Sequence, residues 1–398
     1  MNLNQVKSSP SFSIHSMSTK TFFPHLDALR FFAFFAVFLN HTFNSLGFYP
    51  TDPTIKFIIK NFFYTGDLGV SFFFVLSGFL ITYLLLEEKN STGKIDIKKF
   101  YLRRILRIWP LYFLIVALAL FVFPNATDYV DSGFPIRFGT GKLNPWLYVG
   151  FAGNFDYLLN GISNVIIGIL WSVSIEEQFY LFWPLIIAFV PKKKLLHVFL
   201  LLIIGSVFFR MFCSQGGNIK IIKYHSFSCI TDLTVGAMLA YAVTVETFIE
   251  RIRSIPSYLI TSIYFIGFAL LPFREYIWKF GVNYVKIAAV LPVMIASFFA
   301  FIILEQCYAK HSFYKAGNLK RLSRLGTYTY GMYCYHMVVF FIVLLTFSQL
   351  GADVSSVSLL QLLFTSLLCL LLTIGLSKLS YTYFESAFLN LKKKFASV

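Results

Sequence analysis

The first hydrophobic segment of the chain carries ionisable side chains where lipid disfavours them: Asp27, Arg30 and His41. On an α-helix, eleven residues make about three turns, so Arg30 and His41 share one face at roughly 16 Å along the axis. Asp27 precedes Arg30 by one turn, within reach of an ion pair. An ionisable residue in a membrane helix costs about 2.5–3.5 kcal/mol on insertion scales, which makes it a functional-site hypothesis. In the alternative interpretation, Arg30 snorkels to the headgroups and His41 bonds a neighbouring backbone group.

The composition indicates an integral membrane protein. Of its 398 residues, 57% are hydrophobic, only 13% are charged and 49 are phenylalanine, which lies outside the range of soluble domains. The net charge of +16 would suggest nucleic acid as the partner of a soluble chain. Here the positive-inside rule and anionic lipid explain it, so we expect the bilayer and no nucleic acid as a partner.

Ten apolar segments recur along the chain, each near the length that a transmembrane helix needs. They lie at 28–48, 68–87, 105–123, 171–190, 195–213, 228–246, 255–273, 284–305, 327–349 and 357–380. Basic clusters at 89–107, 192–194, 251–253, 310–324 and 392–394 should face the cytoplasm. We therefore predict an all-α polytopic protein of the cytoplasmic membrane, with about ten transmembrane helices and both termini cytoplasmic.

The remaining segments complete this organisation. Segment 143–158 is short and rich in helix breakers. The basic clusters before and after it should both face the cytoplasm, so the chain crosses the membrane an even number of times between them. Segments 105–123 and 171–190 supply these two crossings, which places 143–158 in an outer loop, 124–170, as a re-entrant or interfacial piece. Residues 1–21 form a polar cytoplasmic tail without the apolar region of a signal peptide. The transmembrane domain is expected over 22–388, followed by a basic cytoplasmic tail at 389–398.

Three arginines, Arg103, Arg104 and Arg107, gather at the cytoplasmic mouth of the third segment. Arg104 and Arg107 share a helix face, and the guanidinium fork suits phosphate geometry. The alternative is a plain positive-inside stop signal.

Two later segments add further polar groups. Glu176 and Glu177 are adjacent in an apolar run, so they point about 100° apart and at most one aims at a given site. Glu176 and Tyr180 share a face. In the ninth segment His336 lies at about the depth of His41, one turn after Tyr333, so both histidines are predicted to line one cavity, unless His336 is a hydrogen-bonded packing residue.

Other ionisable and sulfur-bearing residues favour structural roles. The spacing of the five cysteines is not that of metal ligands, and we interpret them as packing residues, so no metal site is predicted. The charged residues within or at the ends of other segments are expected to pair, several of them structurally: Arg210, Asp232, Glu305, Lys378 and Glu385. There is no nucleophile elbow, because Ser77 stands in Val-Leu-Ser-Gly-Phe, and no P-loop.

These residues give the chain a close resemblance to the acyltransferase-3 family of integral membrane acyltransferases. The resemblance runs from about 22 to 388 and rests on five blocks in order, at 26–41, 69–80, 100–107, 171–184 and 325–336, with a similar close at 379–385. The family usually has Gly where Ala28 stands, often Asp at Ser71 and commonly Trp at Tyr335. These departures leave Arg30 and His41 in place and bear on acceptor specificity.

The resemblance implies transfer of an acyl group, most often acetyl, from acyl-CoA to a hydroxyl of a surface carbohydrate, glycolipid or secreted metabolite. Acyl-CoA would be a cosubstrate rather than a permanently bound cofactor. Some relatives carry a fused SGNH esterase-like domain, and we expect none here, because the chain stops at Val398.

The expected roles follow from combining geometry with that chemistry. Arg103, Arg104 and Arg107, with Arg30, would bind the phosphates of acyl-CoA, and His41 would act as general base or transient acyl carrier. Glu176 or Glu177 would orient a histidine or bind sugar, and Tyr333 or His336 would stabilise the oxyanion. The candidates for acceptor binding or structure are Asp27, Ser77, Trp171, Tyr180 and Tyr333.

Two other classes fit parts of the pattern. A transporter or flippase also uses charges at mid-membrane, but we find no similarity between halves and no reason for arginines confined to one mouth. A glycan polymerase or ligase would need catalytic bases in a large outer loop. Release of free thiol from acetyl-CoA in the presence of sugars separates an acyltransferase from both.

Overall fold

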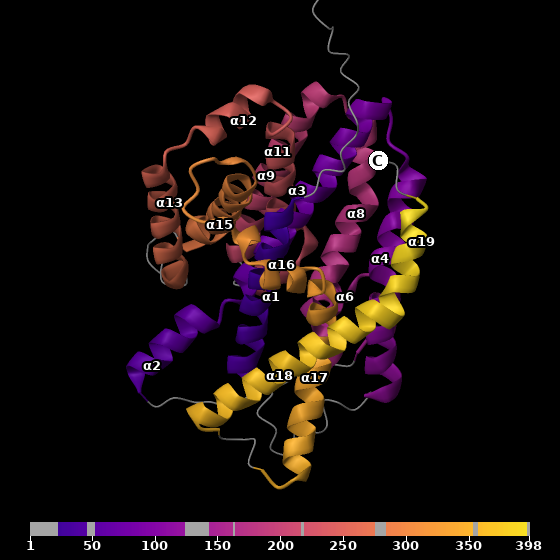
Figure 1. Cartoon of the computed structure of the whole chain (residues 1–398), viewed down its shortest axis with the longest axis vertical. Coiled ribbons are helices and arrows are strands. Elements are labelled where there is room, and N and C mark those ends of the chain that lie inside the picture. Colours follow the sequence, from indigo (N-terminus) through magenta and orange to yellow (C-terminus); the bar gives the residue numbers. More distant parts are fainter. Residues whose placement is uncertain are drawn as a thin grey trace, which may run out of the picture.

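In the computed structural model, the chain folds into helices and connecting loops (Figure 1). The structure describes residues 23–45, 52–123, 143–161, 164–215, 219–274, 284–352 and 357–395, and no strand occurs among them. The longer helices are α1 (Pro24–Ser45), α3 (Gly66–Thr92), α4 (Ile97–Ala117), α8 (Trp171–Phe189), α9 (Lys192–Gln215), α11 (Ser226–Ala242), α13 (Ser257–Leu270), α15 (Tyr284–Tyr308), α17 (Thr329–Gln349) and α18 (Leu359–Ser380).

Short helices join or extend these elements. The α-helical ones are α2 (Pro53–Ile58), α5 (Pro145–Val149), α6 (Gly153–Asn160), α7 (Val165–Gly168), α10 (Ile219–Tyr224), α12 (Glu246–Arg253), α16 (Lys320–Gly326) and α19 (Ser386–Lys393). Three π-helical turns, η1 (Ile59–Phe63), η2 (Leu118–Val122) and η5 (Tyr381–Glu385), and two 3₁₀ turns, η3 (Leu271–Phe273) and η4 (Ala316–Asn318), complete the described chain.

Each of the ten predicted apolar segments corresponds to a helix. In the described ranges, eight helices are long and apolar enough to cross a membrane, and α10–α11 with α12, bent by 98°, would make a ninth. The tenth, Ser257–Phe273, is apolar but shorter. The prediction of an all-α polytopic membrane protein is therefore confirmed, whereas the number of spans and the side of each terminus stay predictions.

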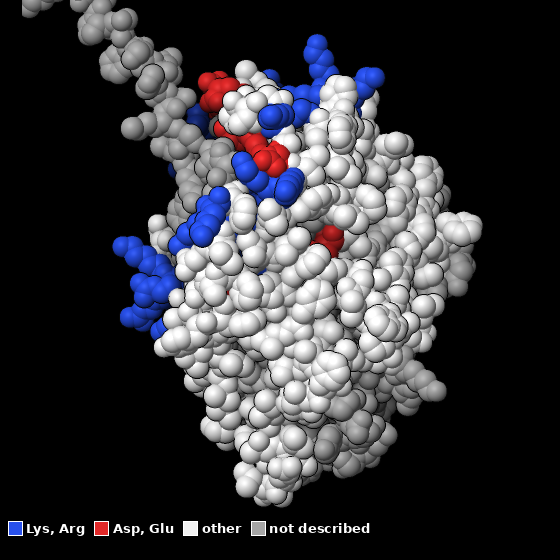
Figure 2. All heavy atoms as spheres, turned by 90° about the vertical axis from the view of Figure 1, so that its right-hand side faces the viewer, with Lys and Arg blue, Asp and Glu red and all other residues white. Residues whose placement is uncertain are grey.

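On one face of the molecule, charged side chains gather toward one end. On the face that carries α4 and α19, Figure 2 shows Lys and Arg toward the upper end and a largely uncharged surface below it. Large apolar side chains face outward, among them Phe121, Phe189 and Leu360, each at least 77% exposed. A soluble protein rarely exposes so much apolar surface, and here lipid would cover it.

Segment 143–158 forms two short helices, α5 and α6, rather than a span. The chain breaks at Phe151, whose φ of 52° interrupts the helix, and its ring packs on Trp109, 5.2 Å away between centroids, and Tyr112, 4.5 Å away. Asn154 and Asp156 are fully buried. The segment is thus packed into the protein against α4 and α8, and its relation to the membrane stays a prediction, as does the outer position of 124–142, which lies outside the described residues.

The predicted tails are described only in part. Residues 1–21 lie outside the described residues. At the other end the predicted boundary at 388 falls inside α19, which packs along α4 and continues to Lys393.

Close crossings of backbone fix the helices that surround the site. A Cβ at Gly78 of α3 would lie 1.9 Å from the carbonyl oxygen of Leu233 in α11, so only glycine permits this crossing. A Cβ at Gly326 of α16 would lie 1.9 Å from the carbonyl oxygen of Asp27 in α1. The sequence thus brings α16 against the first turns of α1, where the ionisable residues begin.

Most of the other charged residues in apolar segments have local partners. Glu305 accepts a hydrogen bond from the Tyr264 hydroxyl at 2.8 Å and lies 4.0 Å from the Lys315 amine. Partial burial lowers the pKa of Lys315, which the Glu305 charge opposes. Glu385 accepts from the Ser380 hydroxyl at 3.1 Å, whereas Lys378 is exposed.

Candidate active site

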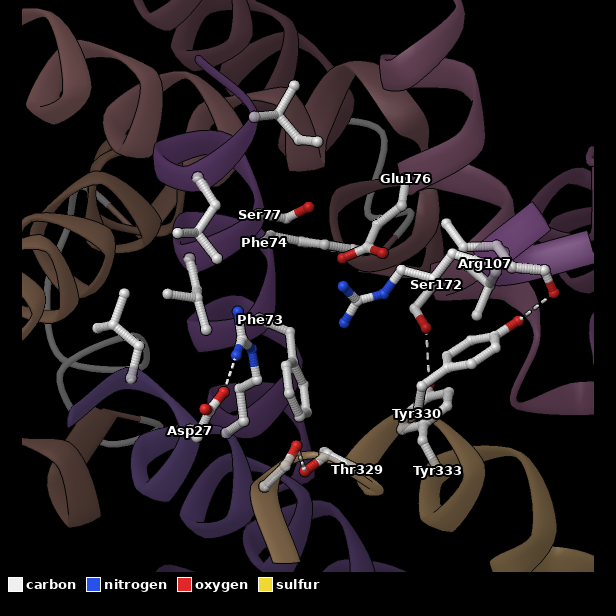
Figure 3. A pocket seen from close by; sticks show the side chains of 18 of the residues that line it. Asp27, Phe73, Phe74, Ser77, Arg107, Ser172, Glu176, Thr329, Tyr330 and Tyr333 are labelled. Carbon is white, nitrogen blue, oxygen red and sulfur yellow. Dashed lines mark hydrogen bonds and ion pairs between the residues drawn. The ribbon is translucent and has the colours of Figure 1, made fainter. Parts of the chain in front are cut away.

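A cavity of about 320 Å³ lies between α1, α3, α4, α8, α16 and α17 (Figure 3). Its polar lining includes Asp27, Ser77, Ser172, Glu176, Tyr180, Thr329, Tyr330, Tyr333 and three arginines, Arg30, Arg104 and Arg107. Side chains from helices far apart in sequence therefore converge on one space.

Arg30 forms the predicted ion pair with Asp27, three residues before it on α1. Both side chains line the cavity, and Gly326 lets α16 approach the Asp27 backbone closely. The pair neutralises one of the three cavity arginines, so Asp27 holds Arg30 in place at the wall.

Arg104 and Arg107 enter the cavity from α4, one turn apart, as the shared helix face predicted. Asp96 caps the start of α4 by accepting the Lys99 backbone N–H, and this hydrogen bond lowers the pKa of Asp96. The Arg104 guanidinium lies over the rings of Phe100 and Tyr180, at 5.8 Å and 5.9 Å. Its Nε atom is buried without a hydrogen-bond partner.

The structure does not bring Arg103, the third arginine of the predicted group, into this cavity. Arg103 donates hydrogen bonds to the Glu88 carboxylate at 3.2 Å and to the Phe395 carbonyl at 3.1 Å. Adjacent helical residues point about 100° apart, so the geometry that aims Arg104 inward turns Arg103 toward α3 and the end of α19. Arg103 thus ties α4 to its neighbours.

Only one of the adjacent glutamates reaches the cavity. Glu176 lines it and accepts a hydrogen bond at 3.2 Å from Tyr180. Tyr180 also bonds Ser77, so Ser77, Tyr180 and Glu176 form a chain of hydrogen bonds along the wall. Glu177 instead accepts from the Trp109 indole N–H at 2.8 Å.

Tyr333 lines the cavity and also contacts one of the two predicted histidines. Its hydroxyl bonds the Ser172 hydroxyl at 2.6 Å (Figure 3) and donates to the Ile169 carbonyl at 3.0 Å. Its ring lies 5.8 Å from that of His336, and the His336 ring lies 5.1 Å from that of His41. The two histidines therefore contact each other, as their matched depth suggested, but neither lines this cavity.

Sequence reasoning missed some members of this site. Tyr330 lines the cavity and donates to the Ile108 carbonyl at 2.9 Å. It lies one turn before Tyr333, so helical spacing was a usable signal. Trp109, which holds Glu177, gave no such signal because the two belong to different helices. The candidate Trp171 packs on Phe74 and Tyr224, at 6.3 Å and 4.8 Å, and is not part of the lining.

Within the described ranges, no group of three or more His, Cys, Asp and Glu side chains is placed to hold a metal ion.

A family profile described as "Acyltransferase domain" matches residues 23–378, which is most of the chain. The chain belongs to the acyltransferase-3 family. This acyltransferase-3 chain is 27% identical over 330 residues to a Staphylococcus aureus (strain COL) protein named "Putative O-acetyltransferase", covering 80% of this chain and 50% of that protein.

Two further relatives of this acyltransferase-3 chain have more specific names. The "Putative peptidoglycan O-acetyltransferase YrhL" of Bacillus subtilis (strain 168) is 26% identical over 348 residues, which are 82% of this chain and 50% of that protein. The "O-acetyltransferase OatA" of S. aureus (strain NCTC 8325 / PS 47) is 27% identical over 235 residues, 57% of this chain and 36% of that protein. The chain spans about half the length of the curated relatives that it matches first. No solved structure matches it significantly.

Proposed function

We propose that this protein transfers an acetyl group from acetyl-CoA to a hydroxyl of a cell-envelope carbohydrate. The observation that carries the proposal is the closeness of an arginine-lined cavity to a pair of histidines: Tyr333 lines the cavity and contacts His336, which contacts His41. The relatives' names support acetyl as the group and a peptidoglycan-like sugar as the class of acceptor.

The cavity suits the phosphates of the donor. In the described part of the chain, neither Arg104 nor Arg107 donates a hydrogen bond to a protein group or pairs with a carboxylate. Guanidinium groups bind phosphate oxygens through two parallel hydrogen bonds. We assign Arg104 and Arg107 to the phosphates, with Arg30 positioned beside them by Asp27, while Arg103 takes no part in binding.

The reaction itself is assigned to His41. The acceptor hydroxyl gives its proton to His41, its oxygen attacks the thioester carbonyl, and the carbon–sulfur bond breaks. The proton then passes from His41 to the departing sulfur, which leaves as free CoA. General-base catalysis of this kind contributes about 10²–10⁴-fold. Tyr333 lines the donor cavity and contacts His336, so we place the path of the thioester toward His41 beside Tyr333.

Thiol release tests this proposal. Purified protein in detergent receives acetyl-CoA with or without fragments of peptidoglycan, and free thiol is followed over time while mass spectrometry seeks the acetylated sugar. We expect thiol release that depends on the acceptor, and an acceptor heavier by one acetyl group. The His41→Ala variant is the control. Release without an acetylated product, or equal release from the variant, would contradict the proposal.

A further inference from the structure

His336 is fully buried, and the environment of its two ring nitrogens differs. The Nδ1 atom lies 2.6 Å from the Tyr333 carbonyl oxygen. A carbonyl oxygen only accepts hydrogen bonds, so the Nδ1 atom carries the hydrogen. In a neutral imidazole the Nε2 atom is then a bare acceptor. This Nε2 atom is buried and has no hydrogen-bond partner among the described residues.

Among the rings around His336, one can donate a hydrogen bond to the Nε2 atom. Three rings contact it: Phe34 at 5.9 Å, Tyr333 at 5.8 Å and His41 at 5.1 Å between centroids. Phe34 has no polar atom, and the Tyr333 hydroxyl hydrogen is committed to the Ile169 carbonyl. His41 alone among the three brings an N–H that is free to donate.

We propose that His336 is a positioning residue for His41, accepting an N–H from one His41 nitrogen so that the other keeps its lone pair toward the acceptor hydroxyl. This inference rests on the proposed function. During transfer the hydroxyl proton moves to the outer His41 nitrogen and later to the sulfur, while the inner N–H stays on its hydrogen bond to His336. His336 itself neither gains nor loses a proton.

This assignment replaces the oxyanion role that the sequence suggested for His336. An oxyanion needs a hydrogen-bond donor, and the only hydrogen on the His336 ring is held by the Tyr333 carbonyl. The nitrogen that a second group can reach is an acceptor. Fixing the tautomer of a catalytic histidine through its second nitrogen is the effect expected of such a partner.

The tautomer is measured first, without any activity assay. The full-length protein, with ¹⁵N-labelled histidine in detergent, is studied by NMR, and His336→Gln and His225→Gln variants assign the two residues. We expect His336 to carry its hydrogen on Nδ1. His225 is an internal reference for the opposite tautomer, with its hydrogen on Nε2, because its Nδ1 accepts the Phe227 backbone N–H at 3.1 Å. A hydrogen on Nε2 of His336 would overturn the proposal.

Two substitutions then separate positioning from packing. The side-chain amide of Gln reaches the place of Nε2 and can accept there, whereas that of Asn reaches only the place of Nδ1. We expect His336→Gln to keep kcat within about threefold and His336→Asn to lose about tenfold or more, the scale of lost orienting partners. The KM for acetyl-CoA should not change in either, because the arginines are untouched.

A packing role predicts the reverse order, because Asn preserves the contact to the Tyr333 carbonyl. An active His336→Asn beside an inactive, folded His336→Gln would therefore refute positioning. The His225→Gln variant controls for loss of a histidine elsewhere. If the wild-type protein transfers no acetyl group, the proposed function fails, while the NMR result still decides which nitrogen of His336 is free.

Discussion

Arginines lie among the apolar helices in two places, and the two places are built differently. Arg210, on α9, is fully buried. Its Nε donates to the Ala289 carbonyl at 2.9 Å, and its Nη1 has three oxygen acceptors within 2.9 Å, from Ser206, Ser228 and Thr231. Only Nη2 lacks a partner. Arg210 therefore joins α9, α11 and α15 to one another.

Arg104 and Arg107 show the opposite arrangement. Their guanidinium groups border an open volume of about 320 Å³, and the described protein supplies neither of them with a hydrogen-bond acceptor. Arg104 is partly buried and Arg107 is exposed, so their donors are available for something that enters the cavity. The comparison teaches that the partners of an arginine among apolar helices separate a packing role from a binding role.

The largest expected effect on activity is at His41, which contacts His336 and does not line the cavity. Changing His41 to Ala should lower kcat by at least about 100-fold, because a positioned base is lost. The melting temperature should stay close to that of the wild type, since the deleted polar group was costly in lipid. His41→Gln cannot take up the proton and should be equally inactive. An active His41→Gln, assayed at matched membrane abundance, would make His41 a packing residue like Arg210.

The reverse pattern is expected at Arg210. Arg210→Met removes the cation, leaves its oxygen acceptors unpaired and leaves Asp232 without the nearby positive charge. Breaking a buried charge cluster costs about 3–5 kcal/mol of stability, visible as a lower melting temperature in detergent. The folded fraction should bind acetyl-CoA normally. A stable Arg210→Met protein with a raised KM for acetyl-CoA would contradict the assignment of Arg210 to a structural role.

A smaller, more selective effect is expected at the cavity arginines. Arg104→Ala or Arg107→Ala should raise the KM for acetyl-CoA about tenfold or more and change kcat little, because each contacts a remote part of the donor. Lysine should rescue partly, since it lacks the fork. Arg103→Ala is the matched control and should leave KM unchanged, because Arg103 bonds Glu88 and Phe395. Equal KM values in all three Ala variants would refute the donor site.

The smallest effect is expected in the hydrogen-bond chain along the cavity wall. Tyr180→Phe keeps the ring beneath Arg104 but removes the hydroxyl that bonds Ser77 and Glu176. Losing such hydrogen bonds is worth about 1 kcal/mol, so we expect about a fivefold loss in kcat/KM and little change in melting temperature. A Tyr180→Phe protein as active as wild type would show that the chain only supports the fold.

Much of the local geometry was predictable because helical spacing is local. The pairing of Asp27 with Arg30 and of Glu176 with Tyr180 followed from separations of three and four residues, and the structure forms both. The same argument stated that at most one of Glu176 and Glu177 aims at a given site. What it left open was which one, because that depends on the position of α4, whose Trp109 holds Glu177.

By itself, the sequence determined the membrane class, the ten apolar segments, the family blocks and the face shared by Arg30 and His41, since periodicity and hydropathy need no knowledge of neighbours. Only the tertiary structure decided that Arg103 bonds Glu88 instead of entering the cavity, that His41 contacts His336, and that Tyr333 both lines the cavity and contacts His336. These outcomes depend on how helices distant in the chain pack and rotate against one another, and backbone crossings such as Gly326 on Asp27 fix those rotations.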